Sequence, residues 1–340
     1  MTWGALAVAV AALSSPLVGA ACANPAATER GFQKGMVFGL FAREEKAHSD
    51  RGLAELKDLG VNSVSIVVPW VTKDIRSLPM APRSDMNPPP PPLTYAIRKA
   101  HELGMTVFLM PFLYVDDIKP GEWRGTIAPP DWQAWFTNYE AFILHYAEIA
   151  QREKVEYFSV GSELCSTESR HDDWGPLLSK VRAVYKGRVT YSANWDHKDG
   201  LSFAKELDVL GMNTYFKLAD APGATVEDLV AAWRPIKADV DAWRAKLGKR
   251  LLITEVGYPS RPGGAVNPWD YDAVGEPDME EQSRCYRAFV QVWGGEQALE
   301  GVYFYIWWGD GGSRDIGYTP RGKPAENVLR QWYGGASGPR

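Results

Sequence analysis

Cysteine and histidine are scarce in this chain, which holds 3 Cys and 5 His among 340 residues. The histidines are scattered and never form the His-x-His or His-Glu-x-x-His spacing that gathers ligands around a metal ion. We therefore expect no metal and no other cofactor. Cys165 should lie just past a strand and Cys285 inside a helix, so we expect two free buried thiols instead of a disulfide.

An excess of positive charge is also lacking. The chain has 37 Lys and Arg against 42 Asp and Glu, a formal net charge of -5, and no run rich in Lys and Arg. Binding to a nucleic-acid backbone or to an anionic membrane surface depends on such a concentration of positive charge. We expect neither nucleic acid nor a lipid surface as a partner of the folded domain.

The longest apolar run stands at the start of the chain, over residues 1–21, and is broken at residues 14–16 by Ser-Ser-Pro. Because it ends in small residues, it favours an export signal over a permanent membrane-spanning helix. The residues before Cys22 resemble a bacterial lipoprotein processing site, with Gly19 in place of the usual larger aliphatic residue and no Lys or Arg near the start. We expect an exported protein, either extracellular or periplasmic after ordinary cleavage, or anchored to the cell envelope only through a lipid on Cys22.

Short β-rich runs then alternate with longer amphipathic stretches, which is typical of parallel strands joined by crossover helices. The eight expected strands cover residues 35–41, 61–68, 105–112, 155–160, 188–193, 207–213, 250–255 and 301–307. Six stretches carry apolar residues at helical spacing, and these cover residues 44–59, 93–103, 132–152, 174–185, 226–247 and 280–293.

Eight repeats of strand then helix predict a single (β/α)8 TIM barrel over residues 34–333, with no second domain. An open doubly wound sheet would carry a Gly-rich phosphate turn after its first strand, and residues 37–43 have none. Long connections at 69–92, 113–130, 258–277 and 308–323 should build loops on the catalytic face. Five prolines at 88–92 are expected to form a stiff spacer in the first of these loops, the alternative being a ligand for a proline-binding module.

Two glutamates follow buried strands at the end where barrel enzymes keep their chemistry. Glu163 comes after the fourth expected strand and Glu255 ends the seventh, so the two should face each other across the barrel mouth. Either glutamate alone could be a solvated loop residue or an ion-pair partner. Together they match the needs of glycosidic bond cleavage, in which one carboxyl group is protonated and the other ionised. Their separation, which decides between retention and inversion, does not follow from the sequence.

Polar and aromatic residues at other strand ends complete the expected site, because pyranose rings pack on aromatic faces and sugar hydroxyls need hydrogen-bond partners. The expected substrate-binding residues are Ser162, Asn194, Trp195, Tyr215, Trp307 and Trp308. Weaker candidates are Arg43, Trp70, Asp116, Asp117, Trp123, Asp196, His197 and Trp269, with Glu168 as a second candidate for the acid.

A glutamate ending strand four, another ending strand seven, a tyrosine at strand six and a tryptophan at strand eight resemble the clan A glycoside hydrolases. Residues 160–164 (Val-Gly-Ser-Glu-Leu) and 254–258 (Thr-Glu-Val-Gly-Tyr) are most similar to glycoside hydrolase family 113, known for endo-β-1,4-mannanases. The resemblance implies Glu163 as acid/base, Glu255 as nucleophile and Tyr215 as the residue that orients the nucleophile. It also implies Trp307 as the floor of the sugar site. One departure is Ser162, which stands where the clan has an asparagine and bears on substrate identity more than on reaction type.

The expected function is therefore a monomeric retaining glycoside hydrolase that acts on a polysaccharide or oligosaccharide through a glycosyl-enzyme intermediate. An endo-β-1,4-mannanase is favoured. A β-glucanase, xylanase or transglycosylase of the same clan would use the same two glutamates. A non-catalytic carbohydrate-binding surface lipoprotein is the alternative from another class.

Overall fold

Parallel strands form a closed ring in the computed structural model, which describes residues 31–41, 46–87, 90–272 and 274–334. The expected export signal, Cys22 and Arg43 lie outside the described residues. The strands of the ring are β1 (Gln33–Phe38), β2 (Ser63–Thr72), β4 (Thr106–Val115), β5 (Tyr157–Ser162), β6 (Arg188–Asn194), β7 (Leu210–Asn213), β8 (Leu251–Val256) and β9 (Leu299–Trp307). A two-residue strand, β3 (Met80–Ala81), pairs antiparallel with the end of β2.

The ring closes because β1 has a parallel partner on each side. Gly35 is in register with Ser63 of β2 and with Tyr303 of β9. The other strands follow in chain order around the ring, and every pairing among the eight is parallel. Since all eight strands run the same way, their carboxyl ends meet at one mouth of the barrel.

Burial on both faces explains the nearly continuous apolar composition of the strands. One cluster of buried side chains fills the interior of the ring, and it consists of Val37, Phe108, Met110, Tyr157, Val209, Leu252, Tyr303 and Ile306. A larger cluster fills the space between the outer face of the strands and the helices. The barrel is therefore a packed core with its polar chemistry confined to its ends.

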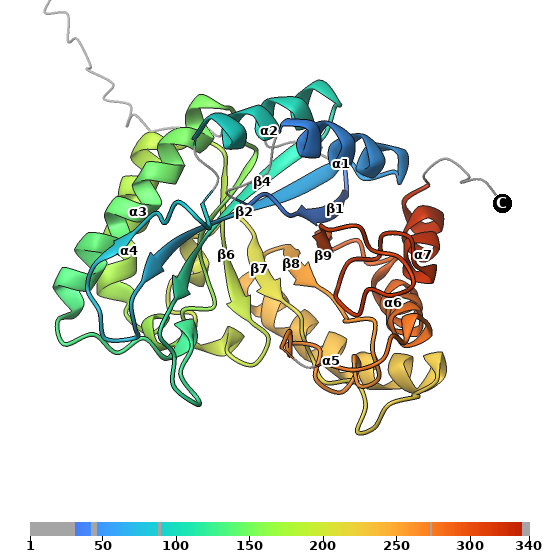
Figure 1. The fold of residues 1–340 in the computed structure, drawn as a ribbon. Coiled ribbons are helices and arrows are strands. Elements are labelled where there is room, and N and C mark those ends of the chain that lie inside the picture. The colour runs from blue at the N-terminus through green and yellow to red at the C-terminus, as the bar shows by residue number, and fades with distance from the viewer. Residues whose placement is uncertain (1–30, 42–45, 88–89, 273, 335–340) are drawn as a thin grey trace, which may run out of the picture. The chain divides into compact units, whose positions relative to one another are not determined.

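Helices cover the outside of the ring, as Figure 1 shows. They are α1 (Lys46–Asp58), α2 (Pro90–Glu102), α3 (Trp132–Arg152), α4 (His171–Val184), α5 (Val226–Leu247), α6 (Met279–Trp293) and α7 (Pro324–Tyr333). Helix α3 begins where the Asp131 side chain accepts a hydrogen bond from the Ala134 N–H. Helix α5 begins with a capping box between Thr225 and Asp228 and ends at Gly248, whose φ of 65° is the left-handed conformation of a helix C-cap.

The prediction of a single (β/α)8 barrel is confirmed, with two differences in the connections. Between β6 and β7 the described chain has only the short 3-10 turns Lys198–Gly200 and Ala204–Glu206, so one of the expected strand-then-helix repeats has no α-helix. Helix α7 lies beyond the six helical stretches that the periodicity indicated.

The proline run is not the loop spacer that the sequence suggested. Pro90, Pro91 and Pro92 form the first turn of α2, while residues 88 and 89 lie outside the described residues. Proline is tolerated there because the first N–H groups of a helix have no intrahelical partner and the fixed φ of proline suits the helix.

Cys165 and Cys285 are both buried free thiols, as expected. Within the ranges that the structure describes, no helix combines the length and apolar character needed to cross a bilayer.

Candidate active site

The two predicted catalytic glutamates lie at the same mouth of the barrel. Glu163 directly follows the last residue of β5, and Glu255 is the last but one residue of β8. Only 6% of Glu163 and 8% of Glu255 is exposed. Both carboxyl groups are therefore held in a largely desolvated position at the end of a rigid strand.

The backbone of Glu163 has an unusual conformation, with a φ of 56° that places a non-glycine residue in the left-handed region. Hydrogen bonds on both sides of the residue hold this conformation. The Glu163 N–H donates to the carbonyl of Ser192 on β6 at 2.9 Å, and the Leu164 N–H donates to the hydroxyl of Tyr191 at 2.7 Å. These two hydrogen bonds to β6 thus fix the direction of the Glu163 side chain.

The Glu163 carboxylate accepts from a different donor on each oxygen. Its Oε1 accepts from Nδ2 of Asn213 at 2.8 Å, and its Oε2 forms an ion pair with the Arg124 guanidinium. Asn213 is fully buried, and its Oδ1 accepts from the Thr254 hydroxyl at 2.7 Å. Hydrogen bonds therefore link Glu163 through Asn213 to Thr254, the residue that directly precedes Glu255 in β8.

The side chain of Ser162 lies 3.3 Å from the same Asn213 amide nitrogen and is only 2% exposed. The Ser162 hydroxyl therefore contacts this amide instead of projecting from the barrel mouth. The amide beside the acid/base candidate comes from Asn213 at the end of β7, which the sequence did not indicate because nothing in its spacing marks it.

Glu255 has a hydroxyl donor and a raised proton affinity. The Tyr215 hydroxyl donates to its Oε2 at 2.7 Å. Burial raises the pKa of Glu255 to about 7, helped by the charge of Glu163, while the Tyr215 hydrogen bond and the Arg124 cation act in the opposite direction. Burial and the nearby Glu255 raise the pKa of Tyr215 well above its usual value, so Tyr215 remains a donor.

Arg124 is a site residue that the sequence analysis missed. It lies in a short 3-10 turn (Arg124–Thr126) in the loop after β4, and its guanidinium carbon is 5.7 Å from the centre of the Phe112 ring. Burial acts to lower the pKa of Arg124, but Glu163 and Glu255 raise it and the net direction is upward. No motif distinguishes this arginine from others in long loops, so only the folded loop reveals it.

The structure does not support Trp307 as the floor of the sugar site. Trp307 is 3% exposed and belongs to the outer cluster, where its Nε1 donates to Glu55 of α1 at 3.1 Å. Tyr305 of β9 instead packs against the interior cluster, with its ring centre 6.4 Å from that of Tyr215. Burial and the charge of Glu255 raise the pKa of Tyr305, which places the aromatic residue of this strand beside the carboxylates.

Three other predicted aromatic residues lie at the catalytic end. Trp195 stacks on Trp269 with ring centres 5.6 Å apart and an interplanar angle of 20°, and 43% of Trp269 is exposed. Trp308 follows β9, is 47% exposed and makes an edge contact with Phe41 after β1. These residues present aromatic surface from the loops after three strands.

The polar candidates on the neighbouring loops have partners within the protein. Asn194 is 7% exposed and donates to Asp196 at 2.8 Å, while Asp116 forms an ion pair with Arg83 at 2.7 Å. Asp117 is exposed, and its backbone N–H donates to the Lys73 carbonyl. None of these contacts involves Glu163 or Glu255.

Trp70 and Trp123 have different surroundings. The Trp70 ring stacks on Phe142 of α3 at 5.0 Å, in the layer between strands and helices. Trp123 lies beside Arg124, whose guanidinium carbon is 5.9 Å from the Trp123 ring centre. Of these two tryptophans, only Trp123 is therefore close to the carboxylate pair.

Glu168 is fully buried behind the Glu163 turn and does not replace Glu163 at the mouth. Its Oε1 accepts from Tyr191, the residue that holds the Leu164 N–H, at 2.8 Å. Burial raises the pKa of Glu168, and His197, with Nδ1 3.6 Å from Oε2, lowers it. Ligand atoms of Cys165, Glu168 and His197 lie within 4.8 Å of one another, so this cluster has donor types that suit a soft divalent cation.

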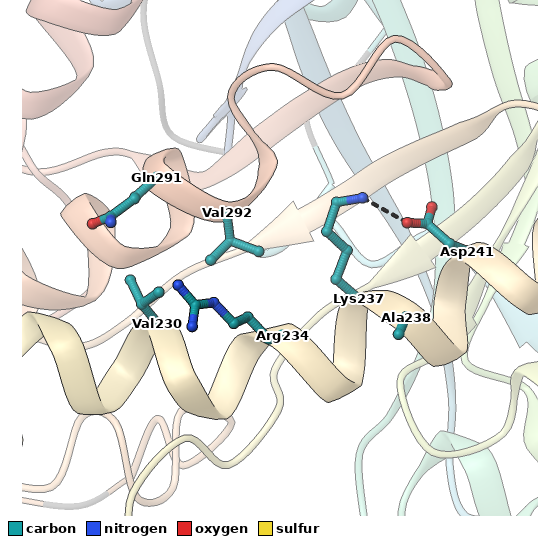
Figure 2. A pocket seen from close by; sticks show the side chains of 7 residues that line it. All are labelled: Val230, Arg234, Lys237, Ala238, Asp241, Gln291 and Val292. Carbon is teal, nitrogen blue, oxygen red and sulfur yellow. Dashed lines mark hydrogen bonds and ion pairs between the residues drawn. The ribbon is translucent and has the colours of Figure 1, made fainter.

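A separate groove lies on the outer helical layer between α5 and α6 (Figure 2). Lys237 in this groove donates to Asp241 at 2.5 Å and to Glu296 at 2.6 Å. The groove is lined by Val230, Arg234, Lys237, Ala238, Asp241, Gln291 and Val292. Neither Glu163 nor Glu255, the two predicted catalytic residues, lines this groove.

Comparisons with known proteins show which family the chain resembles. A β-mannanase of family 113 from Alicyclobacillus acidocaldarius, solved with a bound ligand, is similar at 26% identity and a TM-score of 0.80, over 90% of this chain and 98% of the other. A second family 113 β-1,4-mannanase is similar at 25% identity and a TM-score of 0.79, over 90% of this chain and 99% of the other. A family 5 mannosidase from Rhizomucor miehei shares the fold alone, at 11% identity and a TM-score of 0.57 over 91% and 94% of the two chains.

None of the curated proteins matches the chain in sequence. The family model for Glycoside Hydrolase Family 113, however, matches residues 36–315, which include both strand-end glutamates. The chain is a glycoside hydrolase and belongs to glycoside hydrolase family 113.

Proposed function

We propose that the protein is a retaining endo-β-1,4-mannanase. The observation that carries the proposal is the pair of buried strand-end glutamates, in which Glu255 accepts from Tyr215 while Glu163 sits in a separate hydrogen-bond network. Two carboxyl groups with different surroundings suit the division of labour between nucleophile and acid/base. Similarity to the family 113 β-1,4-mannanases supports mannan as the substrate.

In the first step, a carboxylate oxygen of Glu255 attacks the anomeric carbon as the glycosidic C–O bond breaks, and Glu163 gives its proton to the departing oxygen. This step leaves a glycosyl ester on Glu255 and a carboxylate on Glu163. In the second step, Glu163 takes a proton from a water molecule whose oxygen attacks the same carbon and releases Glu255. Two inversions retain the configuration of the sugar.

Aromatic surface at the mouth suits a chain of pyranose rings. The stacked pair Trp195 and Trp269, together with Trp308, offers apolar faces at the catalytic end. Such faces bind the C–H surface of sugars, while polar groups fix the orientation of the hydroxyls. We assign these tryptophans to sugar stacking and Tyr305 to the position beside the scissile bond.

The test is product analysis of the protein lacking residues 1–21 on β-mannan, glucomannan, xylan and β-glucan, with the anomeric configuration followed by proton NMR. We expect β-configured manno-oligosaccharides as the first products. Early α-products would overturn the retaining mechanism, and selective cleavage of xylan or β-glucan would replace mannan by that polymer. Binding of mannan without any cleavage would favour a non-catalytic carbohydrate-binding protein.

Two isosteric variants identify the catalytic groups in the same assay. Glu255→Gln should lower hydrolysis by about 10⁴-fold or more, because amide oxygen is a poor nucleophile. Glu163→Gln should be far less impaired on an aryl glycoside with an acidic leaving group than on mannan, since that leaving group needs no proton. Glu122→Gln is the matched control, because Glu122 pairs with Arg76 in the same loop region without contacting either glutamate.

We further propose export, on the basis of the apolar run at residues 1–21 and of Cys22 at its end. Expression of the full chain with labelled palmitate tests this point. Label that disappears in Cys22→Ala indicates a lipid anchor, and unlabelled protein outside the cytoplasm indicates ordinary cleavage. Retention of the uncleaved chain inside the cell argues against export.

A further inference from the structure

The hydrogen bonds of the two glutamates favour protonation states opposite to those that the first chemical step needs. Glu163 accepts an amide donor on Oε1 and a guanidinium on Oε2, so both of its oxygens face donors. Glu255, among the described residues, accepts only the Tyr215 hydroxyl at its side chain. Donors on both oxygens favour an ionised carboxylate, whereas the first step needs a proton on Glu163 and an ionised Glu255.

Of the two donors to Glu163, only Arg124 is placed to move. Asn213 is fully buried and fixed at both ends of its amide, by Glu163 and Ser162 on one side and Thr254 on the other. The Arg124 side chain is 29% exposed, comes from a loop, and keeps a buried Nε without a hydrogen-bond partner. An arginine that uses few of its donors has others ready for a ligand.

We propose that Arg124 is a positioning residue that determines which catalytic glutamate holds the proton, by pairing with Glu163 in the sugar-free enzyme and leaving Glu163 when a sugar binds. The inference rests on the proposed function for its chemical meaning. One proton is shared: it resides on Glu255 while Arg124 pairs with Glu163, and it passes to Glu163 when the guanidinium is withdrawn. The displaced guanidinium donates to the bound sugar.

The raised pKa of Glu255 agrees with this resting arrangement, because burial and the anionic Glu163 both favour a proton on Glu255. The arrangement also protects the empty site, since neither a free acid at Glu163 nor a free anion at Glu255 is presented before substrate arrives. The first test below keeps the other titratable side chains around Glu163, which are Cys165, Glu168, Glu255 and Tyr305.

The first test is the pH dependence of kcat/KM on mannan oligosaccharides for the wild type and for Arg124→Gln. The alkaline limb reports loss of the proton that the two glutamates share in the free enzyme. Removing the cation beside Glu163 should move this limb upward by about one to two pH units. Arg124→Lys keeps the charge and should leave the limb close to that of the wild type. Arg76→Gln removes one positive charge from the Glu122 pair and should not move the limb.

A lower kcat/KM at every pH with an unmoved alkaline limb would mean that Arg124 only supports the loop, and the proposal would be overturned. If Arg124→Gln does not fold, Arg124→Met tests the same loss of charge, and circular dichroism establishes which variants are folded.

The second test does not require activity. Carbon-13 NMR of glutamate side-chain carboxyls, with the Glu163 signal assigned by its loss in Glu163→Gln, follows the sugar-free protein through a pH titration. The Glu163 signal should titrate at higher pH in Arg124→Gln than in the wild type. Adding mannotriose to Glu255→Gln should shift the signal toward the protonated position, and the shift should be smaller in Arg124→Gln/Glu255→Gln.

The two tests separate the two proposals. If the wild type cleaves none of the polymers, but its Glu163 NMR signal differs from that of Arg124→Gln as expected, the proposed function is wrong and the Arg124 pairing is supported. If the wild type cleaves mannan, and Arg124→Gln changes neither the alkaline limb nor the Glu163 signal, the present inference alone is wrong.

Discussion

The hydroxyl of Tyr215 donates a 2.7 Å hydrogen bond to Oε2 of Glu255, from the end of β7 to the end of β8. Both partners are largely buried, with 9% of Tyr215 and 8% of Glu255 exposed. A hydrogen bond to a charged acceptor in such surroundings is stronger than one at the surface. This contact therefore stabilises the ionised form of the group that we assign as nucleophile.

Replacement of Tyr215 by phenylalanine should weaken the nucleophile. The hydrogen bond lowers the pKa of Glu255, so its loss raises that pKa and moves the pH profile of kcat/KM to higher pH. We expect kcat/KM near neutral pH to fall by about 10- to 100-fold, as for the loss of a hydrogen bond to a charged group. Tyr318→Phe is the matched control, because the Tyr318 hydroxyl donates to the Pro268 carbonyl and not to Glu255. Equal pH profiles in the two variants would contradict the role of Tyr215.

Ionisation of Glu255 should lower the free energy of unfolding at high pH. Its pKa is raised from 4.5 to about 7 on folding, so folding is favoured by protonated Glu255 and this contribution is lost as the pH rises toward 7. Glu255→Gln, which stays neutral, should therefore become more stable relative to the wild type between pH 4.5 and 7 and keep a constant advantage above that range. The full difference should be on the order of 3 kcal/mol.

Urea unfolding of the wild type and Glu255→Gln at several pH values measures this difference. A stability difference that is independent of pH would show that Glu255 titrates alike in the folded and unfolded chains. Glu122→Gln serves as the comparison, at an ion pair with Arg76 outside the site.

Tyr191 should affect catalysis through the backbone of the Glu163 turn. Its hydroxyl accepts from the Leu164 N–H at 2.7 Å and donates to Glu168 at 2.8 Å. Tyr191→Phe leaves a buried donor and a buried carboxylate oxygen without this partner, which should cost about 1–3 kcal/mol of stability and lower kcat.

The control for Tyr191 is Tyr185→Phe, which removes another buried hydroxyl that donates to the Val155 carbonyl, before the start of β5. This variant should lose stability with little change in kcat. Thermal unfolding and steady-state kinetics on both variants provide the comparison. An equal loss of kcat in the two would show that Tyr191→Phe acts only through general destabilisation.

Trp195 and Trp269 should act as one unit in sugar binding, because their rings stack on each other. Trp195→Ala should weaken binding of mannan oligosaccharides by about 1 kcal/mol, or roughly fivefold. Calorimetric titration of Glu255→Gln carrying each tryptophan change, and both together, measures the effects. We expect the double change to cost less than the sum of the single changes.

Trp70→Phe is the control for the tryptophan pair, since Trp70 stacks on Phe142 between strands and helices. It should lower stability and leave oligosaccharide affinity unchanged. Undiminished affinity in Trp195→Ala would remove this pair from the sugar-binding surface.

Much of the fold could be predicted because periodicity along the chain records burial. Helices α3 and α5 have the bounds that their apolar spacing indicated, and all eight strands lie where continuous apolar runs predicted them. The proline run was misread because three of its prolines occupy the first turn of α2, a position that composition alone does not separate from a loop. No helical period was found between β6 and β7, and the structure has only short 3-10 turns there.

The barrel and the position of Glu163 and Glu255 at one mouth follow from the order of strands and helices along the chain, because parallel strands in a closed ring bring their carboxyl ends together. The side chains that contact these glutamates follow from the folded arrangement alone. It brought in Arg124 and Asn213 and turned Trp307 toward α1 with Tyr305 beside the site. Such contacts depend on how loops and neighbouring strands close in three dimensions, and residues far apart in sequence carry no local mark of that meeting.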